Sequence, residues 1–219
     1  MAVKKWFEFY CQHFSTLELN VTFYRFPRLS TLQDWYERAP DDFVFSVKVP
    51  RSITHFKKLN ETSLMVEDFY GLVREGLKDK LGSVLFQFPP NFSASELHLE
   101  RLANAVNPSF ENVAEFRHPS WWHEEIIAEL GQHQIAFCGM SHPDFPVRLI
   151  GNARHLYYRI HGNKQLYASG YSNAELAALV QQIQSMSSVK KCYIYFNNDI
   201  EGFATENAQT MLRLVAERK

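Results

Sequence analysis

The segment VAEFRH at residues 113–118 is a short apolar run that ends in charged residues. Because neighbouring side chains of a strand point to opposite faces, Glu115 and Arg117 fall on one face. Six further runs have the same form, and they read LELNVTFY (17–24), FVFSVKVP (43–50), VLFQFPP (84–90), IAFCGM (135–140), LYYRIHG (156–162) and CYIYFNN (192–198). We therefore expect seven strands whose polar residues are concentrated at their ends.

Stretches with helical periodicity separate these runs. Three of them begin with a Ser that is followed three residues later by Gln or Glu, the capping-box pattern, at Ser30, Ser93 and Ser172. Apolar residues recurring at three and four positions predict further helices near 3–13, 62–80, 119–132 and 203–217. Between Met140 and Arg154 two prolines leave little room for a helix. Strict alternation predicts parallel strands joined by helical crossovers.

Alternation alone fits both an open, doubly wound sheet and a closed barrel. Helices cover both faces of an open sheet, so polar residues on one face of nearly every strand would be costly there without partners. A barrel interior provides such partners at its C-terminal mouth. We therefore predict an α/β fold, a TIM-like (β/α) barrel that spans residues 1–219 as a single domain. The side chains expected to converge at its mouth are Glu18, Lys48, Gln87, Glu115, Arg117, Arg159, His161 and Asn197.

Composition favours a folded protein without membrane segments. The chain has 219 residues, of which 46% are hydrophobic, enough to bury a substantial core. Its 23 basic and 24 acidic residues nearly cancel, so no global field favours nucleic acid or an anionic membrane. Cys11, Cys138 and Cys192 are widely spaced and odd in number, which suits reduced thiols and predicts a cytoplasmic location. No window approaches ~18 uninterrupted apolar residues, so no membrane contact is expected.

Together, the runs and their neighbours resemble the YecE-like family, also catalogued as domain of unknown function 72. The matching segments are LELNVTFYRFP (17–27), FSVKVPRSITHFKKL (45–59), LGSVLFQFPPNF (81–92), AEFRHPSWW (114–122), YYRIHG (157–162) and YIYFNND (193–199), followed by ATENA (204–208). The resemblance spans essentially the whole chain in ordered blocks. It implies a TIM-like barrel with a polar pocket at the C-terminal face of the strands, and no established activity.

The resemblance also implies which positions line that pocket. They are Glu18, Asn20, Thr22, Tyr24, Lys48, His55, Gln87, Glu115, Arg117, His118, Trp121, Arg159, His161, Asn197 and Asn198. Family members usually open with a strand that carries a Gly-Thr/Cys-Ser/Gly-Gly-Trp-like segment, whereas this chain begins at what should be the first helix, WFEFYCQHF. Seven strands of the usual eight are therefore visible. We expect the true start to lie upstream, or another chain or segment to fill the gap; an uncovered edge would invite self-association.

The carboxylates and cations at the strand ends have two interpretations each. Glu18 suits a general base, with Asn20 and Thr22 beside it, or all three form a buried network that fixes strand register. Glu115 could hold Arg117 for bidentate capture of a phosphate or carboxylate, or the two could form only a structural ion pair. Lys48 and the basic loop that follows it suit an anion-attracting rim, although Lys57 and Lys58 of that loop fit ordinary solvated residues.

The remaining candidates also have a functional and a structural interpretation each. His161 lies at a strand end between Arg159 and the permissive Gly162, which suits proton transfer, although many such histidines are satisfied core residues. Trp121 could stack on a base or sugar, or fasten a helix start to the core. Asn197 and Asn198 could orient a ligand or shape the turn.

These residues predict a binding site for an anionic or polyhydroxylated small molecule, with Glu18, Glu115 and His161 as catalytic residues. Two alternatives stay open. One is a metal-dependent, endonuclease-like barrel that contacts nucleic acid through Trp121, Tyr24 and residues 51–58, and the other is a non-catalytic ligand-binding module. No cofactor or metal is expected, because Walker, dinucleotide, Cys-x-x-Cys and His-pair motifs are absent from the sequence. Whether the protein is an enzyme stays open.

Overall fold

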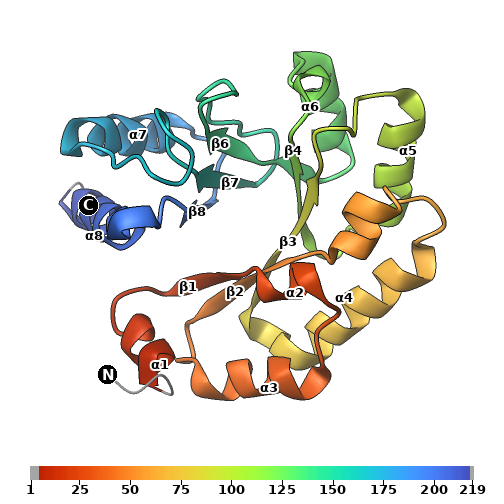
Figure 1. Cartoon of the computed structure of the whole chain (residues 1–219), viewed down its shortest axis with the longest axis horizontal. Coiled ribbons are helices and arrows are strands. Elements are labelled where there is room, and N and C mark those ends of the chain that lie inside the picture. Colours follow the sequence, from red (N-terminus) through yellow and green to blue (C-terminus); the bar gives the residue numbers. More distant parts are fainter. Residues whose placement is uncertain (1–4, 218–219) are drawn as a thin grey trace. The chain divides into compact units, whose positions relative to one another are not determined.

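The computed structural model describes residues 5–217 and divides the chain into two compact units. The first unit ends at Ile135 and the second begins at Ala136. Strands and helices alternate along most of the chain, except that residues 138–154 contain no helix, and neighbouring strands pair in parallel from residue 16 to 116 and from 139 to 196 (Figure 1). The α/β alternation expected from the sequence is therefore confirmed.

The first unit is built on four parallel strands in consecutive order, β1 (Thr16–Leu19), β2 (Val44–Lys48), β3 (Leu81–Phe88) and β4 (Glu111–Phe116). A short strand, β5 (Ile135–Phe137), begins at the last residue of this unit. One face of this sheet is apolar. Its side chains pack on helical aromatic residues, as when Phe45 stacks on Phe7 and Tyr70 contacts Phe86. Burial of this apolar face supplies the main driving force for the unit.

The helices of the first unit connect these strands. They are α1 (Trp6–Cys11), α2 (Val21–Tyr24), α3 (Leu29–Arg38), α4 (Ser63–Leu77), α5 (Glu96–Ala105) and α6 (Glu124–Gln132). Figure 1 shows α3 and α4 side by side, and residues of the two helices are in contact. Short helical turns are η2 (Ser52–Phe56), η3 (Lys78–Lys80) and η4 (Pro119–Trp121), of which η2 is a π-helical turn.

The second unit repeats the pattern on a smaller scale. Its sheet has the order β6-β7-β8, with β6 (Gly139–Ser141), β7 (His155–Ile160) and β8 (Lys191–Phe196). The helical elements are α7 (Asn173–Ser185), η5 (Ile200–Gly202) and α8 (Phe203–Ala216), and α7 lies beside α8 (Figure 1). Buried side chains of these helices contact Ile194 and Phe196, so one face of the sheet is covered by apolar packing.

Several predicted boundaries are wrong, each for a local reason. The run at 17–24 is not one strand, because Asn20 turns into helical backbone and α2 follows. The run at 135–140 is interrupted at Cys138 and contributes both β5 and β6. The helices expected to begin at Ser30 and Ser93 have Arg28 and Ser95 as their N-cap residues.

Other sequence predictions of local structure hold. Ser172 and Glu175 form the expected capping box at the start of α7. Within the described chain, residues 142–154 contain no helix, as the two prolines predicted. Helices long and apolar enough to cross a membrane are likewise absent from residues 5–217. The described strands form two sheets and neither is a closed one, so the expected barrel is not confirmed.

The capping box of α7 gives a testable prediction. The Ser172 hydroxyl accepts from the Glu175 N–H at 3.3 Å, and the Glu175 carboxylate accepts from the Ser172 N–H at 2.8 Å. Replacing Ser172 by Ala should lower the free energy of unfolding by about 1 kcal/mol, because backbone donors of the first turn lose their acceptor. Urea denaturation measures the loss. The matched control is Ser185→Ala at the other end of α7, and equal losses in the two variants would contradict the prediction.

Candidate functional site

The strand register of the first unit places polar residues from four adjacent strands on one face. Glu18 pairs with Ser46, two residues before Lys48, and Gln87 pairs with Glu115. Lys48 pairs with Leu85, two residues before Gln87. Since paired residues of parallel strands point to the same side and the side-chain period is two, these polar side chains share a face. Those of Glu18, Lys48, Gln87 and Glu115 are all buried near the carboxyl ends of β1 to β4.

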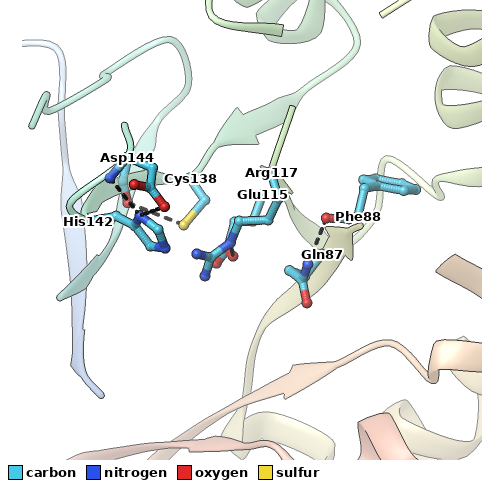
Figure 2. Close-up of polar contacts among 8 residues, drawn as sticks. Gln87, Phe88, Glu115, Arg117, Cys138, His142 and Asp144 are labelled. Carbon is cyan, nitrogen blue, oxygen red and sulfur yellow. Dashed lines mark hydrogen bonds and ion pairs between the residues drawn. The ribbon is translucent and has the colours of Figure 1, made fainter. Parts of the chain in front are cut away.

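A buried ion pair lies at the end of β4. The Arg117 Nε donates to Glu115 Oε1 at 2.6 Å, and the side chains are 13% and 0% exposed (Figure 2). Arg117 follows the last residue of the strand, so its guanidinium is held by a carboxylate that the sheet itself positions. A guanidinium oriented in this way suits charge-assisted hydrogen bonding to a carboxylate or phosphate.

A second carboxylate lies at the end of β1. The Asn20 amide donates from Nδ2 to Glu18 Oε1 at 2.9 Å. The next turn is tied to β2, because the Thr22 hydroxyl donates toward the carbonyl oxygens of Leu19 and Lys48, at 2.8 and 2.6 Å. Asn20 thus orients the Glu18 carboxylate, whereas Thr22 joins α2 to the end of β2. The interpretation of these three residues as one strand stripe is wrong, since only Glu18 lies on the strand.

The side chains of Lys48 and His55 both contact the ring of Phe23. The Lys48 Nζ lies 4.0 Å from the centroid of this ring, and the His55 ring contacts Phe23 edge-on at a centroid distance of 4.9 Å. His55 belongs to η2, the π-helical turn that follows β2. Its Nδ1 is 3.0 Å from the Thr54 hydroxyl. Cation–π and edge contacts therefore fix both side chains at the end of β2.

The surroundings of His55 keep its ring neutral. Burial lowers its pKa to about 4, and the positive charges of Lys48 and Arg51 act in the same direction, against the opposite effect of the Glu115 carboxylate. The protonated imidazole is disfavoured because it would be poorly solvated and close to other cations. At neutral pH this part of the first unit therefore holds a neutral imidazole beside Lys48.

Several residues predicted to bind a ligand make contacts within the first unit. Trp121 is fully buried, its ring stacks on Phe116 at 4.0 Å, and its indole N–H donates to the Phe92 carbonyl at 2.7 Å. This ring has no exposed surface on which a ligand could stack. His118 caps η4, since its Nδ1 accepts from the Ser120 N–H at 3.2 Å. The Gln87 amide donates to the carbonyl of the next residue in β3 (Figure 2).

In the second unit, Arg159 and His161 lie at the carboxyl end of β7. Both are buried, and Arg159 pairs with Met140 on one side and Tyr195 on the other. The His161 N–H donates to the Ser141 carbonyl at 2.9 Å, which continues the pairing with β6 beyond the last residue of β7. These contacts position a cation and an imidazole at the end of one strand, as their spacing predicted.

The asparagines after β8 differ in their contacts. Asn198 is fully buried, and its Nδ2 donates to the Ser169 carbonyl at 2.9 Å and to Asn207 Oδ1 at 3.0 Å. It therefore joins the turn after β8 to the 169–171 segment and α8. Asn197 is half-buried and its N–H donates to the Ile160 carbonyl at 2.7 Å. The interpretation of Asn198 as a turn-shaping residue fits these contacts.

Sequence reasoning missed Tyr171, which lies near the strand ends of the second unit. Its hydroxyl is 2.5 Å from Ser141 Oγ and accepts from the Gly162 N–H at 3.1 Å. His142, also near these strand ends, accepts at Nδ1 from the Asp144 N–H at 3.1 Å, so the proton of the neutral ring lies on Nε2 (Figure 2). The contacts of Tyr171 have no sequence signal, because a loop of irregular backbone forms them.

The donor side chains do not assemble into a metal site. Within residues 5–217, no three or more His, Cys, Asp or Glu side chains form a group that could hold a metal ion. The acidic and imidazole groups described above are engaged with Arg117, Asn20, Phe23 and backbone donors.

Comparisons with known proteins identify the family. The model for a protein of unknown function, DUF72, matches residues 1–219. The chain belongs to the DUF72 family. The resemblance found in the sequence is confirmed, and it extends to YecE of Escherichia coli strain K12, which is 30% identical over 58% of this chain. That match spans 48% of the length of YecE, whereas YunF of Bacillus subtilis strain 168 matches 98% of this chain and 88% of its own at 22% identity.

Solved structures of DUF72 proteins have a similar fold. A family protein from Thermotoga maritima MSB8 superposes with a TM-score of 0.88 and 28% identity, covering 99% of this chain and 91% of its own. Another from Enterococcus faecalis V583 gives a TM-score of 0.83 at 20% identity, covering 99% and 95%. The names of these relatives state no activity and no ligand.

The Glu115–Arg117 pair predicts a large cost for removing one partner. In Glu115→Gln the neutral amide leaves the Arg117 charge without its carboxylate, and the free energy of unfolding should fall by about 2 kcal/mol, the usual cost reduced for the partial exposure of Arg117. The matched control is Glu8→Gln, which breaks the more exposed Glu8–Arg38 pair at 3.0 Å and should cost less than Glu115→Gln, because solvent screens that pair. Urea denaturation curves give the free energy of unfolding of both variants. A loss at Glu115 no greater than that at Glu8 would contradict the prediction.

The lowered pKa of His55 predicts a pH dependence of stability. The unfolded ring takes up its proton near pH 6.5 and the folded ring only near pH 4, so the unfolded state binds more protons between these values. Stability conferred by the neutral ring is therefore lost as the pH falls from 6.5 towards 4. The His55→Gln variant should lose about 1 to 2 kcal/mol less than the parent between pH 7 and 4.5. Parallel urea titrations test this, and equal pH slopes in the two proteins would overturn it.

Proposed function

We propose that this DUF72 protein is an enzyme that binds a small anionic or polyhydroxylated molecule at the carboxyl ends of β1 to β4. The observation that carries the proposal is the shared face of four adjacent parallel strands, on which Glu18, Lys48, Gln87 and Glu115 are buried next to one another. Burying charges is costly unless they have a task or a partner. Ligands of parallel α/β folds bind at the carboxyl ends of the strands.

Electrostatics supports an anionic ligand. Lys48 ends β2 and Arg51 precedes η2, and both positive charges lower the pKa of His55, which supports a positive field at this point. Arg117 adds a guanidinium that its carboxylate partner orients. A ligand with a phosphate or carboxylate group would neutralise these cations and gain charge-assisted hydrogen bonds.

Each residue then has a distinct role. Lys48 and Arg117 bind the anionic group, and Glu115 is a positioning residue that acts through Arg117. Glu18, oriented by Asn20, is the acid–base group on this face. For Arg159 and His161 the roles of anion contact and proton transfer stay predictions from the sequence.

We also propose that the fold is the TIM-like barrel predicted from the sequence. Two features support it: both sheets have parallel strands in consecutive order, and each has a face with buried polar or charged side chains, such as Glu115 and Arg159. In an open sheet covered by helices such faces would lack partners. For the metal-dependent nuclease, residues 5–217 contain no group of three or more His, Cys, Asp or Glu side chains that could hold a metal ion.

Anion binding tests the proposal directly. Inorganic phosphate and citrate serve as probes in isothermal titration calorimetry and thermal-shift measurements. Lys48→Met should weaken binding of the better probe by at least about tenfold, because one desolvated charge–anion contact is lost. Lys57→Met, which removes an exposed charge just after η2, should change the affinity for this probe by less than about twofold. Equal binding by the parent and Lys48→Met would show that the anion site lies elsewhere.

A further inference from the structure

Tyr24, Arg51 and Phe56 lie in the turns that follow β1 and β2. Their planar side chains form an exposed surface, here called the aromatic platform. Tyr24 is the last residue of α2 and is 66% exposed, and Phe56 is the last residue of η2 and is 72% exposed. The Arg51 guanidinium carbon lies 5.7 Å from the Tyr24 ring centroid and 5.4 Å from that of Phe56. One guanidinium therefore links two rings from separate elements.

The aromatic platform differs from the other aromatic clusters of the first unit. Phe88, Phe92 and Trp121 stack on one another inside the core and are fully buried. Tyr24 and Phe56 are instead mostly exposed, and Val21 at the start of α2 is 60% exposed. Exposed rings that gather around one guanidinium next to buried polar groups are typical of binding sites. The π-helical geometry of η2, which presents Phe56, is also frequent at functional sites.

The aromatic platform is continuous with the anion site. Phe23 precedes Tyr24, contacts its ring edge-on at 5.2 Å, and packs on both Lys48 and His55. Arg51 belongs to both places, since it lies against the two exposed rings and its charge also lowers the pKa of His55. A ligand that places its anionic group at Lys48 would thus have planar surfaces next to it.

We propose that the aromatic platform binds the planar ring of a small molecule whose anionic group occupies the site at Lys48. The ligand class is an aromatic ring joined to a phosphate or carboxylate, as in a nucleoside monophosphate or an aryl phosphate. This inference rests on the function proposed above and names the substrate class. Aromatic rings and the guanidinium plane both stack on such a ring, and the cations pair with its charged group.

Charge favours a small molecule over a nucleic-acid strand. The whole chain carries a formal net charge of −1, so it has no excess of cations for neutralising a series of phosphates. Lys48, at the centre of the anion site, is only 8% exposed, which suits one anionic group entering a site better than a backbone lying across a surface. A single-stranded oligonucleotide is therefore a control ligand in the test.

Matched pairs of probes test the inference by calorimetry. Adenosine monophosphate is compared with ribose 5-phosphate, and phenyl phosphate with methyl phosphate, so that each pair differs by the ring. At least one ring-bearing probe should bind about tenfold more tightly than its partner. The double variant Tyr24→Ala/Phe56→Ala should abolish this advantage and leave the ring-free probes within about twofold. The control Leu64→Ala, which truncates an exposed side chain on α4, should change none of the affinities.

The outcomes separate this inference from the proposed function. Equal affinities within both pairs, with ring-free binding still lost in Lys48→Met, would overturn the aromatic platform and leave the anion site standing. The opposite result is also possible. If the ring-bearing probes bind more tightly through Tyr24 and Phe56, but Lys48→Met leaves phosphate binding unchanged, the anion site is overturned. Tighter binding of an oligothymidylate than of either ring-bearing probe would overturn the small-molecule assignment. Unchanged thermal unfolding of the exposed-residue variants ensures that altered affinity is not caused by misfolding.

Discussion

The parallel register of β1 to β4 is the constraint on which the candidate site depends. Paired residues of parallel strands point to the same side, so a polar side chain near the end of each strand necessarily joins its neighbours on one face. The opposite face is apolar and packs on helical aromatic residues such as Phe7 and Tyr70. A shift of one residue would exchange the two faces. Phe45 would then lie on the polar face, and Lys48 would point toward the helices. Hydrophobic burial thus holds the register that collects the polar groups.

Within that frame, the polar groups are organised through their neighbours. Glu115 orients Arg117, Asn20 orients Glu18, and the Phe23 ring lies between Lys48 and His55. These pairs combine residues of the strands with residues of the turns that follow. The positive field at the end of β2 and the exposed rings of Tyr24 and Phe56 come from the same two turns, α2 and η2. Changes in these short segments could therefore alter ligand selectivity while the sheet stays intact.

Particular elements show where sequence reasoning succeeded. The alternation of strands and helices, the parallel pairing and the Ser172–Glu175 capping box were all visible as local patterns. The polar strand ends at Glu18, Lys48, Gln87 and Glu115 also followed from period-two parity. The run at 17–24 misled because its alternation continues past Leu19, although Asn20 turns the backbone into α2. Trp121 misled because an aromatic residue near a strand end looks the same whether it stacks on a ligand or on Phe116.

The sequence by itself determined the spacing of its apolar and polar side chains. This spacing indicates which residues alternate in strands, which recur in helices, and which charged residues end each strand. Those patterns are local, and they depend only on backbone geometry and burial. Only the tertiary structure decided that Asn20 bonds Glu18, that Phe23 lies between Lys48 and His55, and that Arg51 contacts two exposed rings. It also decided that residues 52–56 form a π-helical turn. Such contacts join elements that are separate in the chain, so they depend on packing and on the electrostatic field of neighbouring groups, which have no periodic signature.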